Sequence, residues 1–130
     1  NYDWAVPGQQ NLVVLSQPGT DQPQLAIVVP YDFDYSGLVN APYAFPPETL
    51  PITSVRQRMF RGICRDAESY KKALNEFLEK QDKIYEVINK CPYLRDGSKR
   101  DMKNYLGTFY RDFDKRNTIV NKLLNECQKL

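Results

Sequence analysis

Histidine is absent from this chain of 130 residues. A Ser-His-Asp or Cys-His mechanism within the chain is therefore excluded, because imidazole supplies the base in both. The three cysteines, Cys64, Cys91 and Cys127, are too far apart for a Cys-x-x-Cys metal site. Since no histidine can complete a Cys/His set, the composition also excludes zinc-finger chemistry.

The cysteine count is odd, which fits either buried free thiols or one disulfide with one thiol left over. If the protein is exported, we expect Cys64 to pair with Cys127. This expectation depends on where the predicted helices can fold back on one another, and the spacing along the sequence does not decide it.

Long apolar runs are also missing. No stretch approaches the ~20 residues that a membrane span needs, so we expect no transmembrane segment. The length suits one domain with one modest core. The sequence does not begin with methionine, and we expect it to be a fragment or processed product of a larger protein.

Positive charge is absent from the first part of the chain. Residues 1–55 hold no Lys or Arg and five acids, whereas residues 56–130 hold all 18 basic residues and the other 11 of the 16 acids. A site for a hard cation needs carboxylates without competing ammonium groups, and the first part provides this setting. The alternative is that a proline-rich, loop-rich segment simply carries few charges.

The basic second part does not predict a nucleic-acid partner. Its Lys and Arg residues alternate with Glu and Asp at helical spacing, which is typical of a solvated helix face. No recognition-helix pattern, zinc-finger spacing or aromatic-basic platform is present. We therefore expect no nucleic-acid binding.

The elements expected from the first half are β-strands and a loop. Residues 11–15 and 25–29 are rich in β-formers and are separated by turn residues, so they predict a β-hairpin with a long turn. The proline-rich stretch that follows, up to Pro51, cannot be helical. We expect a long ordered loop there, because side chains such as Tyr43 and Phe45 supply apolar anchors.

The second half predicts helices. We expect a short helix at residues 54–60, ended by Gly62, and then one long helix that Asp66 caps and Pro92 stops. Two more helices follow, beginning near Ser98 and carrying Ile119 to Cys127, with apolar stripes typical of a core. The expected fold is α+β and mostly α, with a hairpin and loop in residues 1–52 and three to four helices in residues 53–130, within one structural domain.

Four residues are candidates for a metal and catalytic site: Asp3, Asn11, Asp32 and Asp34. Asn11 opens the first strand and Asp32 follows the second, so antiparallel pairing should bring them together. Amide and carboxylate oxygens that converge in this way suit Mg²⁺. Alternatively, Asp32 and Asp34 only make a turn, or they form the acid/base pair of a carboxylate hydrolase.

The segment Val-Pro-Tyr-Asp-Phe-Asp at residues 29–34 resembles the strand end of spore-coat CotH kinases. The order of Asn1, Asp3, Asn11, two strands and Asp32 is similar to the catalytic segment of HipA-type and other atypical kinase-like folds. Nearly the whole chain, with residues 29–44, 54–58 and 60–64 the clearest, also resembles an uncharacterised family of exported bacterial proteins common in Bacteroidetes.

The resemblance implies a kinase-like C-lobe fragment, exported to the periplasm or cell envelope, that transfers phosphate from ATP to an unknown acceptor. Asp3 would orient the attacking hydroxyl, Asn11 and Asp32 would hold Mg²⁺ and the nucleotide phosphates, and Asp34 would be a further metal ligand. The alternative, from another class, is an inactive interaction or structural module of the envelope. Its contact surface would be the Pro/Tyr-rich loop at residues 31–52.

The chain departs from the kinase pattern in several places. The spacing from Asp3 to Asn11 is long, no Lys or Arg follows Asp3, and Gln10 stands where the similar family usually has histidine. No Gly-rich loop or phosphate-binding Lys precedes Asp3, so we expect an upstream nucleotide-binding lobe and no activity from this chain alone. A buried salt bridge from Asp32 to a nearby arginine (Arg56, Arg58 or Arg61) would favour the structural interpretation.

Overall fold

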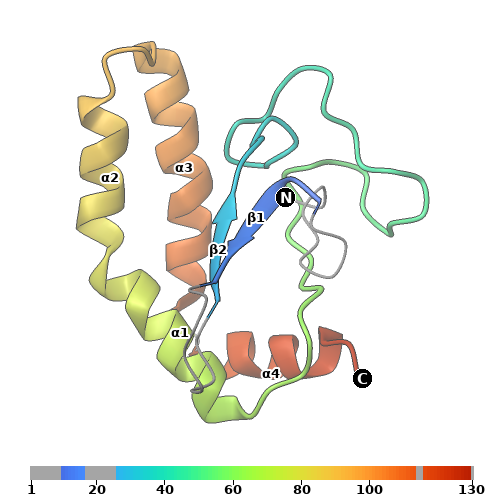
Figure 1. Ribbon diagram of the computed structural model, residues 1–130. Coiled ribbons are helices and arrows are strands. Elements are labelled where there is room, and N and C mark those ends of the chain that lie inside the picture. Colours follow the sequence, from blue (N-terminus) through green and yellow to red (C-terminus); the bar gives the residue numbers. More distant parts are fainter. Residues whose placement is uncertain (1–9, 17–25, 114–115, 130) are drawn as a thin grey trace. The chain divides into compact units, whose positions relative to one another are not determined.

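The computed structural model describes residues 10–16, 26–113 and 116–129. An antiparallel hairpin comes first and helices follow (Figure 1), which confirms the predicted α+β, mostly α fold. None of the helices in these ranges is long and apolar enough to cross a bilayer. The chain divides into two compact units, Asn1–Gln57 and Arg58–Leu130. The elements are β1 (Leu12–Leu15), β2 (Ile27–Pro30), α1 (Ala67–Glu79), α2 (Gln81–Lys90), α3 (Asp96–Asp112) and α4 (Arg116–Glu126).

The hairpin forms from two short aliphatic strands. Leu12 pairs with Pro30 and Leu15 pairs with Ile27, in antiparallel register. Valine and isoleucine fit a pleated surface, and a proline is tolerated at the end of a strand. The long turn expected between the strands falls largely on residues 17–25, which lie outside the described residues.

The loop at residues 31–57 contains no helix or strand and is built from tight turns. Ser36 and Ala44 are buried within it, which gives the loop fixed points of its own. Backbone hydrogen bonds close these turns. Among them, the N–H of Asn40 donates to the Ser36 carbonyl at 2.9 Å, that of Ala44 donates to Ala41 at 3.0 Å, and that of Leu50 donates to Pro47 at 3.0 Å. These turns agree with the predicted ordered loop.

The short helix predicted at residues 54–60 is wrong. A single turn closes at Ser54, whose carbonyl accepts from the N–H of Gln57 at 3.0 Å. The side-chain oxygen of Gln57 accepts from the N–H of Thr53 at 2.6 Å, and the Ser54 hydroxyl accepts from the N–H of Arg56 at 3.1 Å. These side-chain bonds are those of a capping box, which satisfies the first N–H groups of a helix. The helix does not continue, because the N–H of Phe60, which would bond to the Arg56 carbonyl in a helix, donates to the Glu126 carboxylate at 3.2 Å instead.

The single long helix predicted after Asp66 is also wrong, because α1 and α2 are separate helices that meet at Lys80. Neither glycine nor proline marks this position in the sequence. The Tyr110 hydroxyl in α3 donates to the carbonyl of Phe77 near the end of α1, at 3.3 Å. Carbonyls at a helix end need such partners, so a contact from another helix supports the break.

The end of α2 and the positions of α3 and α4 agree with the helices predicted for the second half. Helix α2 ends at Lys90, just before Pro92, as a residue that precedes proline disfavours the helical conformation. Helix α3 begins at Asp96, slightly earlier than the expected start at Ser98. Helix α4 covers most of the last apolar stripe.

The core of the helical unit is aromatic and centres on α3. Phe113 is 3% exposed and Tyr110 is 8% exposed. The Phe109 ring lies edge-to-face on Phe113, with centroids 4.8 Å apart, and Phe77 of α1 lies edge-to-face on Phe109 at 5.8 Å. Tyr85 of α2 lies 5.9 Å from Tyr110. These contacts confirm that the apolar stripes form a core, with ring geometries that aromatic pairs prefer.

A disulfide joins the segment before α1 to the segment after α4. It links Cys64 and Cys127, which confirms the expected pair, and Cys91 is a half-buried free thiol. Beside it, the N–H of Cys64 donates to the Gln128 carbonyl at 3.0 Å, and the N–H of Gln128 donates to the Gly62 carbonyl at 2.9 Å. The two segments therefore form a short parallel bridge that the disulfide crosslinks.

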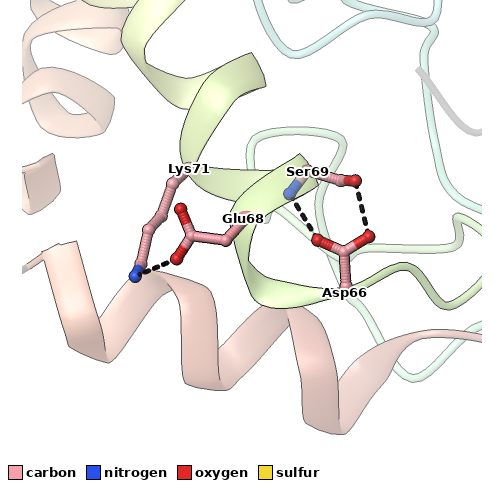
Figure 2. A network of polar contacts seen from close by, with 4 residues as sticks. All are labelled: Asp66, Glu68, Ser69 and Lys71. Carbon is pink, nitrogen blue, oxygen red and sulfur yellow. Dashed lines mark hydrogen bonds and ion pairs between the residues drawn. The ribbon is translucent and has the colours of Figure 1, made fainter.

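Asp66 begins α1 as predicted, and Figure 2 shows the contacts at this end of the helix. Its carboxylate accepts from the backbone N–H of Ser69 at 2.8 Å and from the Ser69 hydroxyl at 2.7 Å. These two hydrogen bonds, the backbone one first, hold the pKa of Asp66 below its ordinary value. Nearby, Lys71 pairs with Glu68 at 2.7 Å on the exposed surface.

We therefore expect Asp66→Ala to destabilise the helical unit in a pH-dependent way. A carboxyl whose pKa is lower in the folded state stabilises that state above its unfolded pKa, and the effect fades as the pH falls below about 4. Urea unfolding of wild type and Asp66→Ala at pH 7 and pH 3 tests this, with a difference expected at pH 7 that shrinks at pH 3. Asp66→Asn keeps a capping oxygen without a titrating group, so its stability relative to Asp66→Ala should change little over this range. A difference as large at pH 3 as at pH 7 would refute the role of the charge.

Candidate functional site

Asn11 and Asp32 lie at the same end of the hairpin. Asn11 immediately precedes β1, and Asp32 follows β2 after one intervening residue, Tyr31. The backbone N–H of Tyr31 donates to the Asn11 carbonyl at 2.9 Å, which continues the pairing of the strands beyond Leu12 and Pro30. Asn11 therefore lies opposite Tyr31, the residue that precedes Asp32, as antiparallel pairing of these strands requires.

At this end of the hairpin, residues just outside both strands have a positive φ, which is uncommon for residues other than glycine. Among the described residues, the positive-φ residues other than glycine are Asn11 at 51°, Asp32 at 55° and Asn40 at 52°. Asn and Asp enter the left-handed region more readily than other side chains do. Since such conformations are enriched at binding sites, the two strand ends are a reasonable place to look for one.

Asp32 is exposed and Asn11 is partly exposed. The exposure of Asp32 does not fit a buried salt bridge, which would favour a purely structural role. One of the arginines considered for that bridge, Arg58, makes its contacts with α3. Its Nη1 donates to the Thr108 hydroxyl at 2.8 Å, and its guanidinium carbon lies 4.1 Å from the centroid of the Tyr105 ring.

Asp34 belongs to a small cluster with two tyrosines. Its Oδ1 accepts from the backbone N–H of Tyr35 at 2.8 Å. The pKa of Tyr43 is raised, first by the negative charge of Asp34 and then by a hydrogen bond to the Asp34 carboxylate, with a smaller contribution from Asp32. The rings of Tyr35 and Tyr43 lie edge-to-face, with centroids 6.2 Å apart. The structure thus brings Asp34 close to Tyr35 and Tyr43.

Tyr43 is the residue of this cluster that the sequence does not identify. The sequence predicts Tyr43 as an apolar anchor of the loop, yet its side chain is 60% exposed. The turn before it, closed by the N–H of Ala44 to the carbonyl of Ala41, follows the left-handed Asn40. The Asn-Ala-Pro sequence at residues 40–42 signals a turn, but it does not reveal that the turn carries Tyr43 to Asp34.

The hairpin end carries few side chains that could be metal ligands. Asp3 lies outside the described residues, and the described part of the chain contains no group of three or more His, Cys, Asp or Glu side chains that could hold a metal. What the hairpin end offers is the Asp32 carboxylate and the Asn11 amide, with Asp34 nearby in the chain. Magnesium in nucleotide sites uses one or two carboxylates and takes its other ligands from phosphates and water. This donor set suits a magnesium–nucleotide complex better than a metal held by protein alone.

Comparisons with known proteins show no family for this chain. No family model matches the sequence, and no curated protein and no solved structure matches it either. The resemblance to kinase-like and exported bacterial proteins stays a prediction, and function is inferred from the residues and their geometry.

Proposed function

We propose that the open end of the β1–β2 hairpin is the metal-binding half of a magnesium-dependent phosphotransferase site that uses ATP. The observation that carries the proposal is the 2.9 Å hydrogen bond from the Tyr31 N–H to the Asn11 carbonyl. This bond, together with the register of the strands, holds Asn11 and Asp32 at one end of the hairpin. Kinase-like catalytic segments use the same order, with an Asn opening one strand and an Asp following the next.

Each candidate residue has a defined task in this proposal. Bound magnesium would neutralise phosphate charge, and the Asp32 carboxylate and the Asn11 amide oxygen would hold it. Asp34, held by Tyr35, would add negative charge beside them. Asp3 would orient the acceptor hydroxyl for attack. Phosphoryl transfer depends on positioning and charge neutralisation more than on a protein nucleophile, so a chain without histidine can carry it.

The proposed phosphotransferase activity needs a nucleotide-binding element and an acceptor that no motif of this sequence supplies. A phosphate-binding Lys and a Gly-rich loop would come from an upstream nucleotide-binding lobe, and the acceptor would be a further partner. By itself the chain would be inactive. Export to the periplasm or envelope belongs to the same proposal, and the Cys64–Cys127 disulfide is compatible with it because disulfides persist in oxidising compartments.

Calorimetric titration of the full-length protein with magnesium and ATP tests the metal role of Asp32. We expect Asp32→Asn to weaken binding about tenfold, because it removes the charge that would face the metal. Asparagine tolerates the left-handed backbone at this position, so the substitution leaves the local fold in place. Asp82→Asn, which changes an exposed carboxylate in the first turn of α2, is the matched control and should bind as the wild type does.

A second readout is independent of nucleotide. Mn²⁺ added in place of Mg²⁺ should broaden the backbone amide resonances of Asn11 and Asp32 first, since a paramagnetic ion relaxes nearby nuclei.

The proposal fails if wild type and Asp32→Asn bind magnesium and ATP equally. It would then give way to the alternative, an inactive envelope module, which the exposed aromatic side chains of the loop (Tyr31, Phe33, Tyr43 and Phe45) favour.

A further inference from the structure

The loop that joins α2 to α3 carries an aromatic side chain in the open. The two helices pack against each other, and residues 91–95 connect them at one end (Figure 1). Within this loop Tyr93 is 93% exposed, more than any other large apolar side chain of the described residues. Pro92 beside it is exposed, and Leu94 is half-buried. The Tyr93 ring therefore adds little burial to the helical unit and is available to another surface.

A row of basic side chains runs along α3 from the same loop. Arg95 precedes the helix, and Lys99 and Lys103 follow at intervals of four residues, which places the three on one helix face. Two hydrogen bonds show where this face lies. The Nζ of Lys99 donates to the Asn89 carbonyl at 2.8 Å, and the Nζ of Lys103 donates to Oδ1 of Asn89 at 2.9 Å. Both ammonium groups are thus held beside the last turn of α2, which leads into the loop.

These two ammonium groups keep their positive charge without a bonded carboxylate in the described part of the chain. Three other lysines each pair with a glutamate three or four residues away: Lys71, Lys90 and Lys122. The oxygens that Lys99 and Lys103 contact belong to a neutral residue instead. Capping of α2 accounts for Lys99 at a helical carbonyl, but it does not account for Lys103 at a side chain. Residues 89–103 as a whole hold five basic residues and two acids.

An open aromatic ring beside a basic row fits the surface of an anionic bilayer. Tyrosine is enriched at the boundary between headgroups and acyl chains, where its ring is apolar and its hydroxyl is wet. Lysine and arginine extend their aliphatic stems along such a boundary and carry their charge to the lipid phosphates. An acidic protein segment would use the charges alone, and the bare ring of Tyr93 would have no part in its binding.

We propose that the α2–α3 loop, with Tyr93 in the loop and Arg95, Lys99 and Lys103 behind it, attaches the protein to anionic lipid headgroups. The Tyr93 ring would lie at headgroup level, and the three basic side chains would bind lipid phosphates. Attachment would need neither metal nor nucleotide, so this proposal goes beyond the phosphotransferase proposal and does not depend on it.

Co-sedimentation of the full chain with vesicles in EDTA tests the attachment. We expect binding to vesicles of equal parts phosphatidylglycerol and phosphatidylcholine, little binding to pure phosphatidylcholine, and release at about 1 M salt, where charges are screened beyond about 3 Å. Lys99→Gln/Lys103→Gln should weaken binding about 25-fold, because each basic residue near an anionic surface contributes about fivefold. Lys71→Gln/Lys122→Gln removes the same charge from α1 and α4 and is the matched control, with a much smaller loss expected.

Substitutions of Tyr93 separate the ring from the charges. Tyr93→Ser should weaken binding at constant charge, and Tyr93→Trp should strengthen it, because tryptophan prefers the same boundary. The helical circular dichroism of all variants should match that of the wild type, since Tyr93 is exposed and glutamine is a good helix former. Equal binding to the two kinds of vesicle, or equal losses from the two double variants, would overturn the proposal. Tighter binding of a polyglutamate peptide than of the mixed vesicles would overturn it in favour of an acidic protein partner. Because no metal or nucleotide is present, its failure is distinct from a failure of Asp32 to bind magnesium.

Discussion

Replacing Cys64 by serine should lower the free energy of unfolding of the helical unit by about 4 kcal/mol. The Cys64–Cys127 disulfide joins residues 63 positions apart. A crosslink over a loop of this length removes many conformations from the unfolded chain, and the loop-entropy relation gives about 4 kcal/mol at 25 °C. This is a large share of the stability of a small domain, which is typically about 5–15 kcal/mol.

The contacts beside the disulfide explain why its loss should spread to both ends of the unit. Among the described residues, the parallel bridge at Ile63 and Gln128 has two backbone hydrogen bonds, those of the Cys64 and Gln128 N–H groups. A further bond runs from the Phe60 N–H to the Glu126 carboxylate at 3.2 Å, at an exposed position. Hydrogen bonds contribute only about 1 kcal/mol each, so without the covalent link the segments before α1 and after α4 should separate readily.

Urea unfolding followed by the helical circular dichroism signal measures this effect. Cys64→Ser/Cys127→Ser should cost little more than Cys64→Ser, because either variant removes the whole crosslink. Cys91→Ser changes the free thiol and should shift the midpoint far less. The prediction is contradicted if Cys64→Ser unfolds at the wild-type midpoint, or if non-reducing peptide mapping finds Cys91 in a disulfide.

The sequence predicts those parts of the fold that local chemistry determines. Two runs of β-formers separated by turn residues indicate the hairpin, Asp66 indicates the start of α1, and Pro92 indicates the end of α2. The break at Lys80 is different, because the contact that supports it comes from Tyr110 in a distant helix. The missing helix near residue 57 is different for the same reason, because the N–H of Phe60 donates to the distant Glu126 carboxylate and a periodicity argument does not contain that contact.

The candidate site is likewise predictable from the sequence only in part. Pairing rules alone place Asn11 beside the residue next to Asp32, so the sequence is sufficient for that half of the arrangement. The left-handed backbone at both residues and the contact of Tyr43 with Asp34 follow from how the loop folds, over a separation that no short motif spans. The pairing of Cys64 with Cys127 likewise depends on the packing of α1 and α4 and not on cysteine spacing.

Replacing Phe113 by alanine should destabilise the helical unit by about 3–5 kcal/mol, the usual cost of deleting a buried ring. Phe113 follows α3 and is 3% exposed. Its ring lies edge-to-face on Phe109, with centroids 4.8 Å apart, and stacks on Tyr110 at 5.8 Å. Removing it leaves a cavity beside Tyr110, whose hydroxyl bonds to Phe77 and supports the break between α1 and α2.

A neighbouring ring provides the matched control. Phe77 also lies edge-to-face on Phe109, at 5.8 Å, but it is 51% exposed. If burial sets the cost, Phe77→Ala should lose less than half of what Phe113→Ala loses, since alanine there leaves a site that water can fill. Phe113→Leu should fall between wild type and Phe113→Ala, because leucine refills part of the cavity.

Urea unfolding of the three variants, with the disulfide intact, gives the order of their stabilities. We expect the midpoints to fall from wild type through Phe113→Leu to Phe113→Ala, with the m-value unchanged, because only the folded state loses contacts. Equal costs for Phe77→Ala and Phe113→Ala would show that ring contacts on Phe109, and not burial, dominate the core. A Phe113→Ala midpoint close to that of the wild type would show instead that Phe113 is not part of a packed core at all.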